Sequence, residues 1–182
     1  MRTKTLCIYS GSRAGSEPSF VAAARELGVL CARAGIVVVN GAGGEGLMGA
    51  VVDAVLGAGG VVEGVIPRFM AVEGLAHPGI GRLEVTGSMH ERKWRMAERA
   101  DAFVALPGGL GTLDELAEIL AWRQLALHGK PVGVLNTAGF YTPLLGFFEQ
   151  MDRFGFLPEP VVGPLLCVAE EPGVLLGKLG LV

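Results

Sequence analysis

Short runs of apolar, mostly β-branched residues recur along the chain, and a segment with helical periodicity follows each of them. Runs that are apolar without alternation are typical of strands buried on both faces, as in parallel sheets covered by helices. Right-handed crossovers place those helices on both sides of the sheet. The pattern therefore predicts an α/β fold: a Rossmann-like, doubly wound parallel sheet with helices on both faces, formed by residues 1–182 as a single domain.

The strands expected from this pattern lie within residues 3–11, 36–46, 61–66, 82–86, 101–106, 131–136 and 164–170. The expected helices cover residues 17–35, 47–60, 88–100, 112–129, 141–155 and 172–179, and residues 67–81 are expected to form a loop. On the helix from residue 112, spacings of three and four predict a core-facing stripe of Leu113, Leu116, Ala117, Leu120, Gln124 and Leu127.

Glycine-rich turns follow three of the expected strands. Glycine supplies 29 of the 182 residues, and it gathers in YSGSRAG from residue 9, NGAGGEGLMG from 40 and LPGGLGT from 106. Ligands of such sheets bind at the carboxyl ends of the strands. A glycine turn that enters a helix leaves amides unpaired beside the positive end of the helix dipole, so these turns predict a seat for an anion. Tight turns and close packing are the alternative explanation.

The third turn is the strongest candidate for a phosphate. Gly108, Gly109 and Gly111 would let the backbone approach it, and Thr112 would add a hydroxyl donor, with Gly43, Gly44 and Gly46 as a second wall. GAGGEG also fits the dinucleotide pattern, but it opens the second βα unit, and the acidic residue would fall near Glu63, inside a strand. No G-K-[ST] follows any of the turns, so a P-loop is not favoured either.

Charged residues gather where two helices are expected to begin at this edge. Glu115 and Glu118 share a helix face beside the phosphate seat, and a carboxylate there needs a cation such as Arg92 or a catalytic purpose. Three structural alternatives stay open. TLDE is a capping box if Thr112 is the N-cap, SMHE is another from Ser88, and the charges of residues 88–100 can form a solvated face.

Composition excludes several classes of partner. A net charge of -3 argues against a nucleic-acid surface, and no apolar run approaches the roughly 20 residues that span a membrane. The apolar LCIY near the start is too short for a signal peptide, so secretion is not expected. Three cysteines without a C-x-x-C pair suggest neither disulfides nor a zinc site, which favours a cytoplasmic protein. No metal or other cofactor is expected.

SMHERK followed by LPGGLGTLDE resembles the LOG family, often labelled lysine decarboxylase-like. Its signature P-G-G-x-G-T-x-x-E is matched by Pro107, Gly108, Gly109, Gly111, Thr112 and Glu115. The resemblance extends over nearly the whole chain through GSRAG, GLMG, GVIP, LAHPG and LHGKPVGVLN.

The resemblance implies a phosphoribohydrolase that cleaves the N-glycosidic bond of a cytokinin nucleotide or AMP, releasing the base and ribose 5-phosphate. It implies Arg92 and Glu115 as catalytic residues, and a homodimer or larger homo-oligomer. Pyridoxal phosphate chemistry is not expected, because no Schiff-base lysine is evident near the turns. The predicted substrate-binding residues are Lys93, Gly108, Gly109, Gly111, Thr112, Gly11, Ser12, Gly43, Gly44, Gly46, Met89 and Glu118.

The chain departs from the family pattern at a few positions. Asn40 and Ala42 stand in a stretch that is usually Y-G-G-G, Ala121 replaces a threonine, and Gly74 replaces a glutamate, with Glu73 one position earlier. These departures are expected to affect base recognition more than phosphate binding. The alternative to an enzyme is a protein of the same fold that carries or senses a nucleotide-like ligand without cleaving it.

Overall fold

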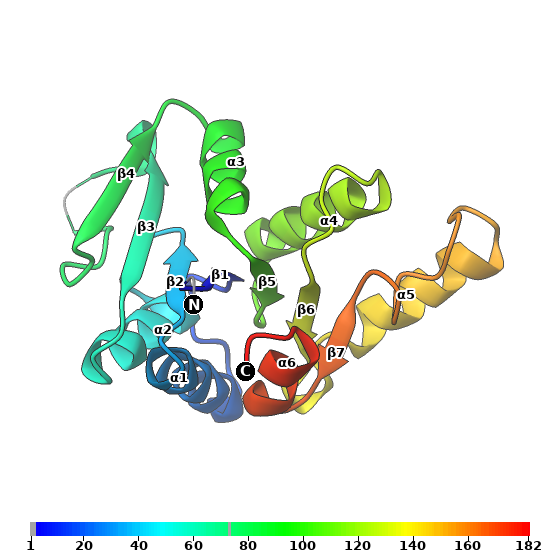
Figure 1. Ribbon diagram of the computed structural model, residues 1–182, viewed down its shortest axis with the longest axis horizontal. Coiled ribbons are helices and arrows are strands. Elements are labelled where there is room, and N and C mark those ends of the chain that lie inside the picture. The colour runs from blue at the N-terminus through cyan, green and yellow to red at the C-terminus, as the bar shows by residue number, and fades with distance from the viewer. Residues whose placement is uncertain (1–2, 73) are drawn as a thin grey trace.

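The computed structural model describes residues 3–72 and 74–182. Within them the expected alternation of strands and helices is confirmed (Figure 1). The elements are β1 (Thr5–Tyr9), α1 (Pro18–Arg33), β2 (Val37–Asn40), α2 (Gly46–Gly57), β3 (Val62–Pro67), β4 (Arg82–Thr86), α3 (Met89–Arg99), β5 (Ala102–Ala105), α4 (Leu110–Gln124), β6 (Val132–Leu135), α5 (Thr142–Arg153), β7 (Cys167–Ala169) and α6 (Pro172–Lys178). Two short 3-10 helices occupy Arg68–Met70 and Thr137–Gly139.

The strands form one parallel sheet in the order β4-β3-β2-β1-β5-β6-β7. The chain runs outward from β1 to β4, then returns to the middle of the sheet and continues from β5 in the other direction. The point where the strand order reverses therefore lies between β1 and β5, whose ends align through the pair Tyr9 and Ala105. In open α/β sheets this is where a crevice for a ligand opens.

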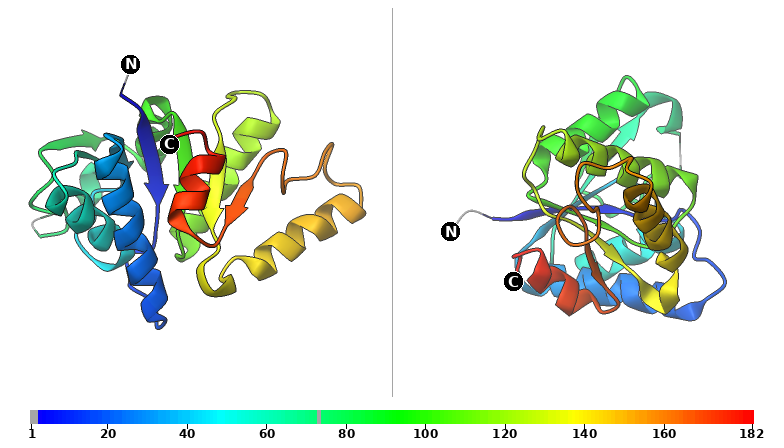
Figure 2. Two further views of the ribbon diagram at one scale, coloured as in Figure 1. Left: turned by 60° about the horizontal axis from the view of Figure 1, so that its bottom comes forward. Right: turned by 90° about the vertical axis from the view of Figure 1, so that its right-hand side faces the viewer.

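Helices cover both faces of the sheet, as expected. Residues of α1, α2 and α6 pack with the strands into one hydrophobic cluster, and residues of α3 and α4 pack into another on the opposite face. The right-hand view of Figure 2 shows the two layers, with α1 and α6 on one side and α3 and α4 on the other. None of the helices in the described part of the chain is long and apolar enough to cross a membrane.

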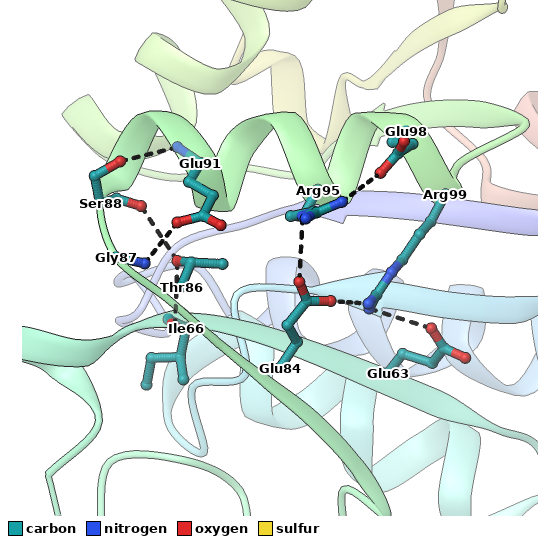
Figure 3. A network of polar contacts seen from close by, with 10 residues as sticks. All are labelled: Glu63, Ile66, Glu84, Thr86, Gly87, Ser88, Glu91, Arg95, Glu98 and Arg99. Atoms are coloured by element: carbon teal, nitrogen blue, oxygen red, sulfur yellow. Dashed lines mark hydrogen bonds and ion pairs between the residues drawn. The ribbon is translucent and has the colours of Figure 1, made fainter.

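The edge strand β4 is tied to α3 by a network of charged side chains (Figure 3). Arg99 bridges Glu63 of β3 and Glu84 of β4, and Arg95 also pairs with Glu84 at 3.3 Å. Arg99 and the two carboxylates are partly buried, so this network is screened less than isolated surface pairs. It therefore fixes α3 against the sheet.

The start of α4 differs from the prediction. The helix begins at Leu110 with Gly109 as its N-cap, so Thr112 lies inside the first turn and the capping box proposed for Thr112 and Glu115 is wrong. Glycine at 109 supplies the extended backbone that starts the helix, with φ -94° and ψ -155°. The helix also ends at Gln124 rather than near 129.

The predicted core-facing stripe of α4 is only partly right. Leu116 and Leu120 are buried, but Leu113, Ala117 and Leu127 are exposed, and Leu127 lies beyond the end of the helix. The buried face runs instead through Thr112, Glu115, Leu116, Ile119 and Leu120. Apolar spacing alone misplaced the stripe because two polar residues of α4 face inward.

Helices α1 and α2 approach closely at Gly28, which predicts a measurable effect of a single methyl group. A Cβ at residue 28 would lie 2.8 Å from the carbonyl oxygen of Val51 and 2.9 Å from the Cβ of Ala54. We expect Gly28→Ala to lower the free energy of unfolding by about 1–3 kcal/mol in a urea titration.

Gly146→Ala is the matched control for this prediction. Gly146 also lies inside a helix, α5, where an added Cβ meets nothing within 4 Å. It should raise stability by about 0.5–1 kcal/mol through helix propensity. Equal effects of the two changes would contradict the close approach of α1 and α2.

Candidate active site

The turns that follow β1 and β5 lie directly against each other. The amide of Gly11 donates a hydrogen bond of 3.0 Å to the carbonyl oxygen of Pro107. A Cβ at Gly108 would lie 2.9 Å from the amide nitrogen of Gly11 and would also collide with Oγ1 of Thr112. Bare backbone is thus required at this junction, because two main chains and a helix start share one small space.

The start of α4 is a free anion seat at the glycine turns. The amides of Leu110, Gly111 and Thr112 have no acceptor in the described part of the protein, as is usual for a first turn. They point out of a helix whose N-terminus carries about half a positive charge. A phosphate can bind there through several amides at once.

Most amides of the second glycine turn are already used by the protein. At the start of α2, the amides of Leu47 and Met48 both donate to the carbonyl oxygen of Gly11, at 3.1 and 3.2 Å. The amide of Gly43 donates to Sδ of Met48 and that of Gly44 to the carbonyl oxygen of Leu75. This turn packs against the first one, as the structural alternative supposed, and the amides of Gly43 and Gly44 are not free to form a second wall.

Arg92 reaches the site from the first turn of α3. Ser88 is the N-cap of this helix, as predicted, and its Oγ accepts from the amide of Glu91 at 3.1 Å. The carboxylate of Glu91 accepts from the amide of Gly87 instead of closing the box on Ser88. Arg92 is 7% exposed, and its Nε donates to the carbonyl oxygen of Val65 at 3.1 Å.

Glu115 meets Arg92 from α4. Its Oε1 lies 3.2 Å from Nη1 of Arg92, within ion-pair distance, and the residue is 7% exposed. Burial raises the pKa of Glu115 from its usual value near 4.5 to about 7, although the positive charge of Arg92 acts to lower it. A carboxyl group with such a pKa can exist as acid or as carboxylate near neutral pH.

A cavity of about 320 Å³ opens beside this pair. A second cavity of about 330 Å³ adjoins it through Gly11, Ser12 and Gly109 and extends to Phe20 and Phe140. Within residues 3–72 and 74–182, no group of three His, Cys, Asp or Glu side chains is placed to hold a metal ion. The first cavity is lined by Ser10, Gly11, Ser12, Met48, Met70, Met89, Arg92, Gly109, Leu110, Gly111, Thr112 and Glu115.

The structure brings most of the predicted site residues to this cavity and leaves others away from it. Lys93 and Glu118 do not line it, because Nζ of Lys93 is held by Asp114 at 2.9 Å and Glu118 at 3.1 Å in a cluster that joins α3 to α4. Burial lowers the pKa of Lys93, but hydrogen bonds to both carboxylates leave it raised. The glycines of the cavity wall are Gly11, Gly109 and Gly111, whereas Gly108 lines the second cavity and Gly43, Gly44 and Gly46 line neither.

Sequence reasoning missed Ser10, Met48, Met70 and Leu110. Ser10 and Leu110 stand in the glycine-rich stretches YSGSRAG and LPGGLGT, and Met48 stands in the GLMG segment, so all three could have been found there, whereas nothing marks Met70 within its expected loop. Among the departures from the family pattern, Asn40 is buried and Ala121 is exposed. Gly74 adopts φ 81°, and Glu73 lies outside the described residues.

Comparison with known proteins identifies relatives over most of the chain. A family model described as "Possible lysine decarboxylase" matches residues 48–179. The probable cytokinin riboside 5'-monophosphate phosphoribohydrolase LOG4 of Oryza sativa subsp. japonica is 44% identical over 176 residues, covering 97% of this chain and 76% of the rice protein. Cytokinin riboside 5'-monophosphate phosphoribohydrolase LOG1 of Arabidopsis thaliana is 40% identical over 97% of this chain and 82% of its own length.

Solved structures share the fold at lower identity. The molybdenum cofactor carrier protein from Chlamydomonas reinhardtii superposes with a TM-score of 0.74 at 24% identity, over 99% of this chain and 98% of that chain. The molybdenum cofactor binding protein from Rippkaea orientalis gives 0.74 at 23% identity, over 99% and 97% of the two chains. These likenesses show the Rossmann-like fold.

The raised pKa of Glu115 predicts how stability depends on pH. Between about pH 4.5 and 7 the unfolded chain loses the proton of this group while the folded protein keeps it, so the free energy of unfolding falls as pH rises. Relative to Glu115→Gln, which does not titrate, we expect the wild type to lose about 2–3 kcal/mol between pH 4.5 and 8. Urea titrations of both proteins at several pH values measure this, and a constant difference between them would disprove the shift.

Proposed function

Since the chain belongs to the LOG family of phosphoribohydrolases, we propose that it hydrolyses the N-glycosidic bond of a purine nucleoside 5′-monophosphate. The products are the free base and ribose 5-phosphate. The observation that carries the proposal is the buried pair of Arg92 and Glu115, which faces a cavity beside the free amides of α4. A phosphate seat, an acid and a cation within one cavity are the parts that this reaction needs.

The 5′-phosphate binds at the first turn of α4. The amides of Leu110, Gly111 and Thr112 supply donors and the helix dipole favours the negative charge. Gly11 and Ser12 line the same cavity from the turn after β1. This contact lies away from the reacting bond, so its binding energy orients the ribose for reaction.

Glu115 acts on the reacting carbon of the ribose. As the bond between C1′ and the base nitrogen breaks, positive charge develops on the sugar, and a carboxylate beside it stabilises that charge. A water molecule adds its oxygen to C1′ and gives up one proton, while the departing base gains one. Glu115, with a pKa near 7, can accept the proton of that water.

Arg92 acts on the leaving base. Its guanidinium lies against the carbonyl oxygen of Val65 and beside Glu115, so its position is fixed before substrate binds. A guanidinium keeps its proton at all working pH values, so it stabilises the electron pair left on the base without giving a proton away. Met48, Met70 and Met89 line the cavity with flexible apolar side chains, which suit a purine.

The description carried by the family model, a lysine decarboxylase, finds no support at this site. Decarboxylation with pyridoxal phosphate needs a lysine amine that can form a Schiff base. Lys93, the residue next to Arg92, binds two carboxylates through its ammonium group and does not line the cavity. The proposal therefore follows the curated relatives rather than this description.

Glu115→Gln tests the proposal directly. We expect base release from AMP and from isopentenyladenosine 5′-monophosphate to fall by at least about a hundredfold, since the amide neither stabilises the cation nor accepts a proton. Nucleotide binding should change little, because the phosphate contacts stay in place. Chromatography of free base and equilibrium dialysis of nucleotide measure the two effects.

Glu149→Gln is the control for this experiment. Glu149 is an exposed carboxylate on α5, and its change should leave turnover as in the wild type. Full turnover by Glu115→Gln would refute the role of Glu115. Tight nucleotide binding by the wild type without any release of base would instead favour the alternative, a carrier or sensor.

We also propose that two copies of the chain associate through α3 and α4. Trp94 is 56% exposed, and Leu125 and Leu127 are each 69% exposed. Trp94 and Trp122 are in contact, with tilted rings whose centroids lie 5.7 Å apart, and they border a largely apolar hollow of about 240 Å³. An apolar surface of this kind on a folded chain marks a protein contact, and a second copy is the partner that the relatives' family suggests.

Sedimentation velocity tests this association. At micromolar concentration the wild type should sediment as a dimer or larger species, and Leu127→Glu should shift it toward the monomer, since a charge would enter an apolar contact. Phe147→Glu, at a 52% exposed position on α5, is the matched control and should leave the assembly intact. A monomeric wild type, or dissociation by the control alone, would overturn the proposed interface.

The compartment that we propose is the cytoplasm. Cys7, Cys31 and Cys167 are free thiols in the structure, and the first two are buried. Burial raises the pKa of Cys31 to about 12, which keeps it in the unreactive thiol form. Three unpaired thiols are usual in a reducing environment.

A further inference from the structure

Ser10 lines the site, and its side-chain hydroxyl has no hydrogen-bond partner in the part of the chain that the structure describes. It directly follows β1 and is 5% exposed. Its Oγ is fully buried and forms no hydrogen bond with any residue in the described ranges, 3–72 and 74–182. Buried polar atoms are nearly always hydrogen-bonded, so an exception that lines a cavity indicates a missing ligand.

Ser10 lines the same cavity as Arg92 and Glu115. Helices α3 and α4 both pack against β1, so the end of this strand lies beneath the helices that carry Arg92 and Glu115. Both backbone groups of the next residue, Gly11, are hydrogen-bonded within the protein. Its amide donates to the carbonyl oxygen of Pro107, and its carbonyl oxygen accepts from two amides at the start of α2. Ser10 therefore offers the cavity a hydroxyl that the surrounding turn does not use.

A second unpaired atom belongs to the same cavity. Oε1 of Glu115 is buried and forms no hydrogen bond to any described residue, although Arg92 lies within ion-pair distance. Both residues line one cavity, so a ligand bound there can satisfy both unpaired atoms. The phosphate occupies the start of α4 and the base lies against the methionines and Arg92, which leaves the ribose hydroxyls for this space.

We propose that Ser10 hydrogen-bonds the ribose 2′-hydroxyl of the substrate and makes the protein selective for ribonucleotides over 2′-deoxyribonucleotides. This inference rests on the proposed function. The 2′-hydroxyl stands on the carbon next to C1′, so a contact with it lies beside Glu115. Hydrogen bonds to this hydroxyl strengthen as the glycosidic bond breaks, and a site that binds a hydroxyl rejects the analogue that lacks it.

The test compares AMP with 2′-deoxy-AMP in the wild type and in Ser10→Ala. Loss of the hydrogen bond should reduce kcat/KM for AMP by about tenfold or more and leave the value for 2′-deoxy-AMP within about twofold. For each protein, the kcat/KM value for AMP is divided by the value for 2′-deoxy-AMP. The intrinsic lability of the deoxyribosyl bond affects this ratio equally in the wild type and in Ser10→Ala, so it cancels when the two ratios are compared. Ser12→Ala, on the phosphate side of the cavity, should reduce both substrates alike.

A binding measurement separates failure of this inference from failure of the proposed function. In the Glu115→Gln background, AMP should bind more tightly than 2′-deoxy-AMP, and Ser10→Ala should remove that preference whether or not the wild type releases base. The free energy of unfolding of Ser10→Ala should stay equal to or above that of the wild type, because no protein partner is lost. Equal losses for both nucleotides, no loss for either, or reduced stability would each overturn the role of Ser10.

Discussion

A guanidinium and a carboxylate that are both almost fully buried form the interaction on which the site depends. Arg92 and Glu115 are each 7% exposed and 3.2 Å apart. A buried ion pair repays its desolvation only when other polar partners complete it. Arg92 has such a partner in the carbonyl oxygen of Val65, but Oε1 of Glu115 has no hydrogen-bond partner among the residues described. The effect of burial on the pKa of Glu115 therefore outweighs the opposite effect of the arginine charge, and this pKa rises to about 7. The pair is thus a reactive centre more than a stabilising contact.

The surrounding structure holds this pair from outside the cavity. On α3, Arg99 and Arg95 fix the helix to the edge strand β4 and its neighbour β3, and Lys93 joins α3 to Asp114 and Glu118 of α4. These contacts keep the starts of α3 and α4 in register, and Figure 3 shows those that Arg95 and Arg99 make. The charged face of α3, which the sequence allowed to be a solvated surface, therefore positions Arg92 through partly buried pairs.

The fold and the two catalytic candidates were predictable because they rest on local patterns, whereas the wall of the cavity was not. Continuous apolar runs identify buried strands, and the glycine turns identify the edge where ligands bind. Thr112 was misjudged as a cap because the glycine at 109 starts the helix earlier, which no spacing rule reveals. Met70 reaches the cavity only through tertiary packing and carries no signal in the sequence, and the glycine turn that contains Ser10 does not reveal which of its side chains faces the cavity.

Two departures from the family pattern are coupled in the structure. Ala42 adopts φ 67°, a conformation that costs a residue with a Cβ about 1–2 kcal/mol, and Oδ1 of Asn40 accepts from its amide at 2.9 Å to hold it there. The Cβ of Ala42 fills space over Gly64, where another Cβ would be only 2.7 Å away. Neither Asn40 nor Ala42 lines the cavity, so they act on it through Gly41, whose missing side chain makes room for the guanidinium of Arg92. Any effect of these departures on base preference is therefore transmitted through the position of Arg92.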